Sequence, residues 1–181
     1  MDIIIGNIFK ILTLYKVLFL KLIGVQIGLF SKSIIWHIPK IRYAKMIKIG
    51  NNFQIGKYCR MTGNIEIGNN VFINEFGSIN AGISEDSKIT IGDNVMFGPG
   101  VFLQSGDHSF KKGEIYMFSN EGKSLPIIIG NNVWVGARTI VLKGVTIGDN
   151  SVIGAGSVVT KDIPSGVVAV GNPAKVIKEI V

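Results

Sequence analysis

Apolar residues recur at every sixth position through most of this chain, with glycine often next in sequence and polar residues between. The recurring positions are Ile49, Ile55, Met61, Ile67, Ile73, Ile79, Ile91, Phe97 and Leu103, and then Ile129, Val135, Val141, Ile147, Ile153 and Val159. A period of six fits neither an amphipathic helix nor a long alternating strand. It fits a short strand followed by a tight turn, and three such units close a triangular coil. The pattern predicts an all-β fold, a parallel β-helix of about five coils.

The turns between these units carry their own signal. GNN and GDN triplets supply glycine and asparagine, which tolerate the positive φ angles of tight corners. Each coil is expected to stack on the previous one at about 4.8 Å, the spacing of hydrogen-bonded strands. The inward aliphatic residues then form continuous apolar columns. We assign residues 45–181 to this domain, including a C-terminal closing segment.

Residues 1–44 form a separate, strongly apolar segment that is predicted to be helical. Lys10, Lys16 and Lys21 interrupt it, so no uncharged run approaches the roughly 20 residues of a membrane span. Asp2 stands where a secretory signal would carry positive charge. The segment is expected to bury its surface against the domain or a neighbouring subunit. The alternative is a helix lying in a bilayer interface with its lysines towards the headgroups.

The net charge indicates what kind of partner the protein binds, and the cysteine content indicates the redox state of its compartment. The formal net charge is +7, which suggests an anionic partner. No helix-turn-helix, zinc or aromatic RNA-binding signature is present, so nucleic acid is not expected. A phosphorylated small molecule or an anionic membrane surface explains the charge equally well. The single cysteine, Cys59, cannot form an internal disulfide, which favours a reducing, cytoplasmic location.

The register passes through Glu85, which breaks the apolar rule without changing the phase, and the phase itself is lost once, after Leu103. The distance from Leu103 to Ile129 is 26 residues, two more than a multiple of six, so a loop at about 105–126 is expected to project from a corner. Projecting loops on rigid scaffolds often carry binding and catalytic groups. This loop holds the candidate polar residues, which are Asp107, His108, Glu114, Tyr116 and Glu121.

Residues 127–180, IIIGNNVWVGARTIVLKGVTIGDNSVIGAGSVVTKDIPSGVVAVGNPAKVIKEI, resemble the hexapeptide-repeat acyltransferases. They are most similar to the O-acetyltransferase branch that includes the galactoside, maltose and serine enzymes. The resemblance extends over about residues 45–180. It implies a left-handed β-helix and a homotrimer with active sites between neighbouring subunits.

The resemblance also gives His108 a role, because the family has its catalytic histidine just before this loop. An imidazole ordinarily titrates near pH 6.5 and can remove the proton of an attacking hydroxyl. We expect direct acetyl transfer from acetyl-CoA to a sugar hydroxyl, without an acyl-enzyme. A thioester on Cys59 is the less favoured alternative, since Cys59 occupies a small-residue position of its hexad and fits a buried structural role. No metal is expected, because a zinc hydrase on this scaffold needs three histidines and the chain has His37 and His108 alone.

Three polar residues are candidates for binding the acceptor. In related sugar enzymes an asparagine near this stretch contacts the acceptor, and Asn74 matches that position better than Asn80 does. The spacing does not decide between them, and a corner asparagine explains either one. Asp107 is a candidate for orienting His108, for binding acceptor hydroxyls or for capping the turn.

The C-terminal coils are expected to bind the coenzyme. By residue match to the family, these coenzyme-contacting residues are Trp134, Ala137, Arg138, Ala155, Thr160, Lys161 and Lys175. The alanines supply backbone contacts to the pantetheine arm, and the basic residues are candidate phosphate partners. Alternatively, Trp134 packs at a coil edge between subunits, and the basic residues are ordinary solvated surface charges.

The acceptor is the least determined feature. The apolar, lysine-bearing N-terminus resembles that of enzymes from bacterial surface-polysaccharide pathways. This resemblance favours a glycan or its lipid-linked precursor as the acceptor, acetylated at the inner face of the cytoplasmic membrane. Alternatives are a soluble acceptor such as a simple sugar, serine, an antibiotic or an amino-sugar nucleotide, and a non-catalytic binding protein.

Overall fold

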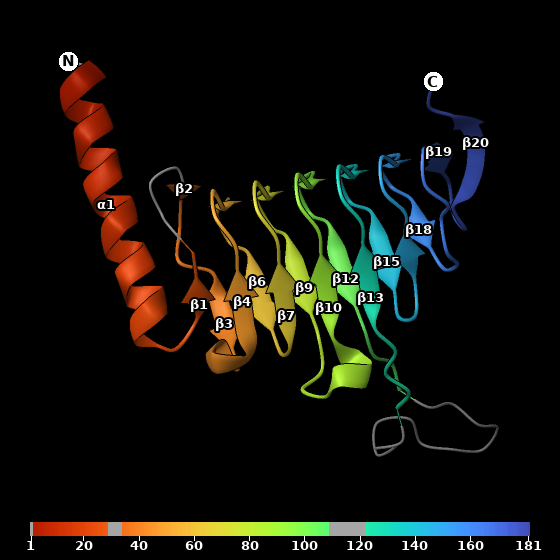
Figure 1. Cartoon of the computed structure of the whole chain (residues 1–181), viewed down its shortest axis with the longest axis horizontal. Coiled ribbons are helices and arrows are strands. Elements are labelled where there is room, and N and C mark those ends of the chain that lie inside the picture. The colour runs from red at the N-terminus through yellow and green to blue at the C-terminus, as the bar shows by residue number, and fades with distance from the viewer. Residues whose placement is uncertain (1, 29–33, 109–121) are drawn as a thin grey trace.

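The computed structural model describes residues 2–28, 34–108 and 122–181, with side chains described from residue 11 onwards. The predicted loop positions Glu114, Tyr116 and Glu121 lie outside the described residues. The chain forms one N-terminal helix followed by a left-handed parallel β-helix (Figure 1). Helix α1 spans Asp2–Leu22, and two short 3-10 helices, η1 (Ala44–Met46) and η2 (Glu85–Ser87), lie at corners.

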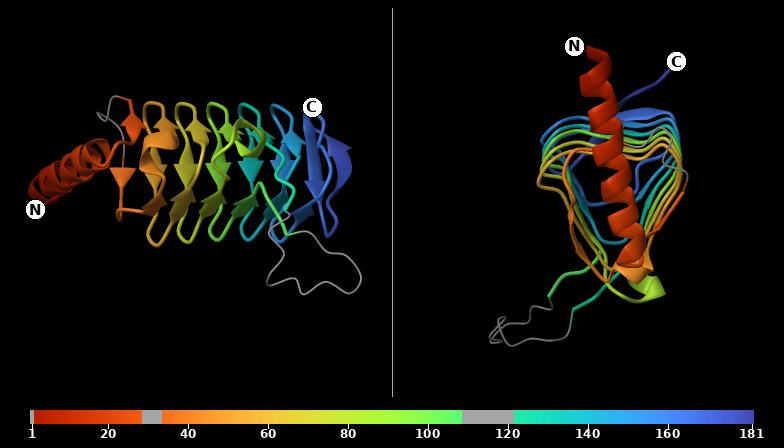
Figure 2. Two further views of the ribbon diagram at one scale, coloured as in Figure 1. Left: turned by 90° about the horizontal axis from the view of Figure 1, so that it is seen from below. Right: turned by 90° about the vertical axis from the view of Figure 1, so that its left-hand side faces the viewer.

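Three parallel sheets form the sides of the solenoid, which has a three-sided outline down its axis (Figure 2). Sheet A contains β1 (Gln26–Ile27), β4 (Ile47–Ile49), β7 (Ile65–Ile67), β10 (Ile89–Ile91), β13 (Ile127–Ile129) and β16 (Thr146–Ile147). Sheet B contains β2 (Ile34–Ile35), β5 (Gln54–Ile55), β8 (Phe72–Ile73), β11 (Met96–Phe97), β14 (Trp134–Val135), β17 (Val152–Ile153), β19 (Val167–Val170) and the antiparallel β20 (Lys175–Glu179). Sheet C contains β3 (Lys40–Arg42), β6 (Arg60–Thr62), β9 (Ser78–Asn80), β12 (Phe102–Gln104), β15 (Ile140–Leu142) and β18 (Val158–Val159).

The solenoid has six coils rather than the predicted five, because β1, β2 and β3 form a first coil before residue 45. The inward residues of this coil are Ile27, Ile35 and Ile41, separated by eight and then six residues, and eight more lead to Ile49. Two of its corners therefore carry two extra residues each. This phase slip hides the coil from a strict count of six.

The predicted apolar columns are present. In sheet A, Ile49, Ile67, Ile91, Ile129 and Ile147 stack in register from coil to coil. None of them is more than 5% exposed. Full burial of such a side chain contributes about 1.5–3 kcal/mol, so the columns are the main stabilising element of the fold.

The corner between sheets A and B confirms the interpretation of the GNN and GDN triplets. Its third residue has a φ between 53° and 59° in five successive coils, at Asn52, Asn70, Asn94, Asn132 and Asn150. Their side-chain amides bond from one coil to the next, for example Asn52 Nδ2 to Asn70 Oδ1 at 2.8 Å. Asparagine thus supplies both the left-handed backbone and a hydrogen-bonded ladder along the edge.

The two ends of the solenoid are covered differently. Helix α1 crosses the N-terminal end and buries Val17 and Leu20 against it, while Lys16 Nζ donates to the carbonyls of Ile35 and Trp36 at 2.8 and 2.9 Å (Figure 1). Strand β20 folds back on β19 at the other end. Within the described residues, no helix combines the length and the apolar character needed to cross a bilayer.

Candidate active site

The base of the predicted loop lies at the corner between sheets C and A, after the fourth coil. Its two ends run antiparallel for a few residues. Leu125 N donates to Ser105 O at 2.9 Å, and Asp107 N donates to Lys123 O at 3.3 Å. This pairing holds both ends of the loop against the rigid solenoid, where the phase slip predicted an extruded segment.

His108 is the last described residue before the segment 109–121. It lines a cavity of about 260 Å³, whose other walls are Ala81, Gly82, Gln104, Gly106, Asp107 and Ser124. The imidazole is exposed in the isolated chain. The third coil supplies Ala81 and Gly82, and the fourth coil supplies Gln104, so two stacked coils form the wall opposite the loop.

Asp107 contacts a lysine of the next coil. Its Oδ2 lies 2.5 Å from Lys143 Nζ, and the same ammonium group donates to Lys123 O at 3.2 Å. Lys143 therefore binds both sides of the loop base at once. The three roles considered for Asp107 stay predictions beside this ion pair. Sequence reasoning missed Lys143, whose only signal is its position beside a corner glycine, Gly144, one coil beyond the loop.

Replacing Lys143 with methionine is expected to lower kcat/KM about tenfold, because the loop base loses its cross-link and His108 its fixed position. Stability should change by only about 0.2–1 kcal/mol, since the ion pair is partly solvated. Steady-state assays and urea unfolding measure the two effects. Lys40→Met is the control with an exposed lysine elsewhere. Combining Asp107→Asn with Lys143→Met should lower kcat/KM no further than Lys143→Met alone. Additive losses would contradict a role for the Asp107–Lys143 ion pair in holding the loop base.

The two candidate acceptor asparagines lie at different places. Asn80 ends β9, pairs in register with Gln104 and leads directly into the cavity wall. Its Nδ2 donates to Ser78 Oγ at 3.0 Å. Asn74 lies at the corner between sheets B and C, where its Oδ1 accepts from Glu75 N at 2.8 Å. Within one chain, Asn80 is therefore beside the His108 cavity and Asn74 is at another corner.

The candidate coenzyme residues also divide between corners. Ala137, Arg138 and Ala155 lie at the B–C corner of the last two complete coils, where Gly156 N donates to Ala137 O at 2.8 Å. Thr160 and Lys161 follow β18 at the C–A corner, the same corner as His108. These two groups stand on different edges of the prism within one chain.

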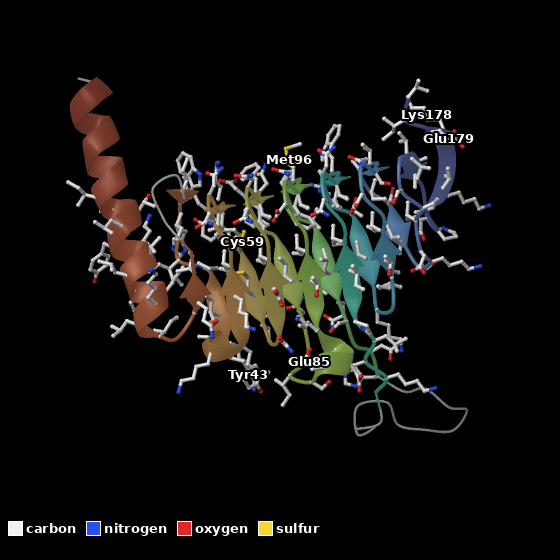
Figure 3. The ribbon with its side chains drawn as sticks, in the orientation of Figure 1. Tyr43, Cys59, Glu85, Met96, Lys178 and Glu179 are labelled. Atoms are coloured by element: carbon white, nitrogen blue, oxygen red, sulfur yellow. The ribbon has the colours of Figure 1, made fainter. Side chains whose placement is uncertain are left out.

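Trp134 belongs to a third group on the outer face of sheet B. It is half exposed and lines a cavity of about 700 Å³ together with Val152, Val168 and β20 residues that include Lys178 and Glu179. Lys175 begins β20. Figure 3 shows Lys178 and Glu179 at this C-terminal end of the solenoid, far along its axis from Cys59.

Cys59, labelled in Figure 3, is buried at the B–C corner of the second coil, whereas the His108 cavity lies at the C–A corner after the fourth coil. Its Sγ donates to Asn74 O at 3.1 Å. Burial raises the pKa of the Cys59 thiol above its ordinary value, so the nucleophilic thiolate is disfavoured. These observations support a structural thiol rather than an acyl carrier.

Cys59→Ala is expected to leave acetyl transfer within about twofold of the unmodified chain and to cost about 1 kcal/mol of stability. Because the folded-state pKa is raised, the thiol contributes stability that is present below its ordinary pKa of about 8.5 and is lost as the pH rises through the folded value. Iodoacetamide should therefore label the native protein much more slowly than the unfolded chain. Rapid native labelling accompanied by loss of activity would contradict the structural role.

In the part of the chain that the structure describes, no three His, Cys, Asp or Glu side chains are grouped as a metal site. The chemical groups at the His108 cavity are an imidazole, an amide side chain, a serine hydroxyl, a lysine-paired carboxylate and backbone amides. They can accept a proton and donate hydrogen bonds to an oxyanion.

The hexapeptide repeat is also found in known proteins. A family model described as the hexapeptide repeat of succinyl-transferase matches residues 126–161. A galactoside O-acetyltransferase of Escherichia coli is 49% identical over 128 residues, covering 68% of this chain and 58% of that protein. The chain thus spans less than two thirds of that relative's length. A putative lipopolysaccharide biosynthesis O-acetyl transferase of Escherichia coli is 33% identical over 150 residues, covering 77% of this chain and 74% of that protein.

Among solved structures, an N-acyltransferase from Bacillus cereus superimposes with a TM-score of 0.80 at 26% identity, covering 90% of this chain and 88% of the other. That structure is a mutant in complex with dTDP-4-amino-4,6-dideoxyglucose and coenzyme A. The shared architecture extends over most of both chains.

Proposed function

The chain belongs to the hexapeptide-repeat acyltransferase family, and we propose that it is an acetyl-CoA-dependent O-acetyltransferase that modifies a sugar hydroxyl. The observation that carries the proposal is His108 at the base of the loop, beside a cavity with polar walls. Two of the matching curated relatives are named a galactoside O-acetyltransferase and a putative lipopolysaccharide biosynthesis O-acetyl transferase, which supports this class of reaction.

In the proposed reaction, the His108 imidazole takes the proton of the acceptor hydroxyl as its oxygen attacks the thioester carbonyl. A new C–O bond forms, and the carbonyl oxygen carries negative charge in the tetrahedral intermediate, where hydrogen-bond donors stabilise it. The C–S bond then breaks. The coenzyme thiolate leaves and takes the proton from the imidazolium, so His108 is regenerated and no group remains on the protein.

We propose a homotrimer with the site between neighbouring subunits. The candidate coenzyme residues support it, because Ala137, Arg138 and Ala155 stand on one edge of the prism and His108 on another. An edge of one solenoid facing a different edge of its neighbour brings both sets into one cleft. In the same arrangement, Asn74 at the B–C corner of one subunit would lie near the acceptor bound beside the His108 of its neighbour. Asn80 lies near the His108 cavity of its own chain.

For the acceptor we propose a glycan of a bacterial surface polysaccharide or its lipid-linked precursor, modified in the cytoplasm at the inner face of the membrane. The similarity to a lipopolysaccharide biosynthesis protein over 77% of the chain supports this class. The competing acceptor is a soluble small sugar, which the 49% identity to a galactoside enzyme favours.

An acceptor screen tests the proposal. Purified protein is incubated with acetyl-CoA and each of three acceptor classes: a simple galactoside, an amino-sugar nucleotide and a lipid-linked oligosaccharide. Thiol release and the mass of the product are recorded. The expected product is an acetyl ester that mild alkali removes, whereas an alkali-stable acetamide would indicate N-acetylation. Absence of acceptor-dependent thiol release with every class would contradict the proposal.

A further inference from the structure

Helix α1 has one buried face and one exposed face. Val17 and Leu20 are fully buried against the first coil, and Thr13 is nearly so. The exposed apolar residues are Ile11, Leu12, Tyr15, Leu18, Phe19 and Leu22, with exposures from 37% to 84%. Counting 100° per residue, these six occupy one continuous arc of about 120° opposite the buried face. We call them the outer face of α1.

The outer face points away from the solenoid, because α1 runs across the N-terminal end with its inner side against the coil (Figures 1 and 2). Among the residues that the structure describes, packing of the chain on itself leaves these six side chains exposed. An apolar arc of this width is more than scattered exposed residues require, and it marks a contact with a partner or a lipid surface.

Charge separates these two kinds of contact. Ten of the 19 Lys and Arg residues precede residue 66, against one of the 12 acidic residues. Near the helix, Lys21 and Lys48 line one cavity of about 490 Å³ together with Glu66, whose carboxylate is paired with Lys88, and Lys45 lies against Gly24. Lys21, Lys45 and Lys48 are all exposed. An apolar arc bordered by positive charge is complementary to an anionic lipid surface, whereas a second copy would bring like charges together.

We propose that α1 lies in the plane of an anionic bilayer surface, with its outer face among the acyl chains and the nearby lysines at the headgroup phosphates. The solenoid axis then points away from the bilayer. His108 follows the fourth coil, three coil spacings beyond the first, which is roughly 15 Å further from the surface. A sugar attached to a lipid carrier is within that range. This last step rests on the proposed function, while the lipid contact itself does not.

The test is co-sedimentation of the full chain with vesicles of phosphatidylcholine, with and without about one third phosphatidylglycerol. The unmodified protein is expected to pellet with the anionic vesicles and to be released in part by high salt, which screens the lysines. The double variant Leu18→Gln/Leu22→Gln should bind about 30-fold more weakly, because two apolar side chains no longer enter the lipid.

Matched changes elsewhere serve as the control. Ile83→Gln/Ile177→Gln alters two residues that are each 59% exposed and lie outside α1, and it should leave vesicle binding unchanged. Circular dichroism and the unfolding midpoint should be the same for both double variants, since all four positions are exposed.

Three results would overturn the lipid contact. The first is failure of the unmodified protein to pellet with anionic vesicles, and the second is equal pelleting of the Leu18/Leu22 variant. The third is a concentration-dependent assembly that the same variant dissolves, without any vesicle binding, which would make the outer face a contact between copies. Transfer to a soluble sugar separates this proposal from the enzymatic one: vesicle binding without transfer to any acceptor defeats the proposed function alone, and transfer without vesicle binding defeats the lipid contact alone.

Discussion

Replacing His108 with alanine is expected to lower kcat by about 10²–10⁴-fold while leaving the fold intact. Positioned general bases typically contribute that factor, and the residual rate reflects substrate positioning alone. His108 is exposed in the isolated chain and belongs to no apolar column, so its removal should change the free energy of unfolding by less than about 0.5 kcal/mol. Thiol-release kinetics and thermal unfolding measure the two quantities.

His37 provides the matched control, because it is the other histidine and is exposed in the first coil. His37→Ala should retain the full rate. Coenzyme A binding, measured by calorimetry, should be the same for both variants, which separates loss of the base from loss of the coenzyme site. A His108→Ala protein that keeps full transfer activity would refute the general-base mechanism.

Gly63→Ala is expected to reduce stability by about 3 kcal/mol or more and to lower activity as well. Gly63 has a φ of 87°, a conformation that costs other residues roughly 1–2 kcal/mol. An added Cβ would also overlap the carbonyl oxygens of Ala81 and Gly82 in the next coil. Ala81 and Gly82 line the His108 cavity, so the displacement that relieves the overlap also moves the cavity wall.

Gly166→Ala separates the cost of the positive φ from the cost of the steric overlap. Gly166 has a φ of 72°, but a Cβ there would meet no atom within 4 Å. It should therefore cost only about 1 kcal/mol, the conformational part alone, and should leave activity unchanged. Urea unfolding and kcat/KM for the two variants give the comparison. Equal losses of stability would contradict a steric clash between a Cβ at residue 63 and the carbonyl oxygens of Ala81 and Gly82.

The sequence by itself determined the repeating part of this protein. Inward residues such as Ile49 and Ile67 are 18 residues apart, the period of the coil, and the period follows from local strand and turn lengths. The corner asparagines, for example Asn70, were predictable because left-handed backbone favours that residue type. The loop between Leu103 and Ile129 was predictable as well, since a phase slip of two residues cannot be absorbed within a strand.

Only the tertiary structure decided which residues share a corner and which surfaces stay uncovered. The first coil carries extra corner residues, so counting by six did not reveal it. The contact between Asp107 and Lys143 joins residues 36 positions apart, and it depends on the stacking of two coils across the loop. Which side of α1 is buried depends on its contact with the first coil. The sequence period determines which positions of each coil form strands and corners. The contacts between residues far apart in sequence depend on how the coils and the helix pack on one another.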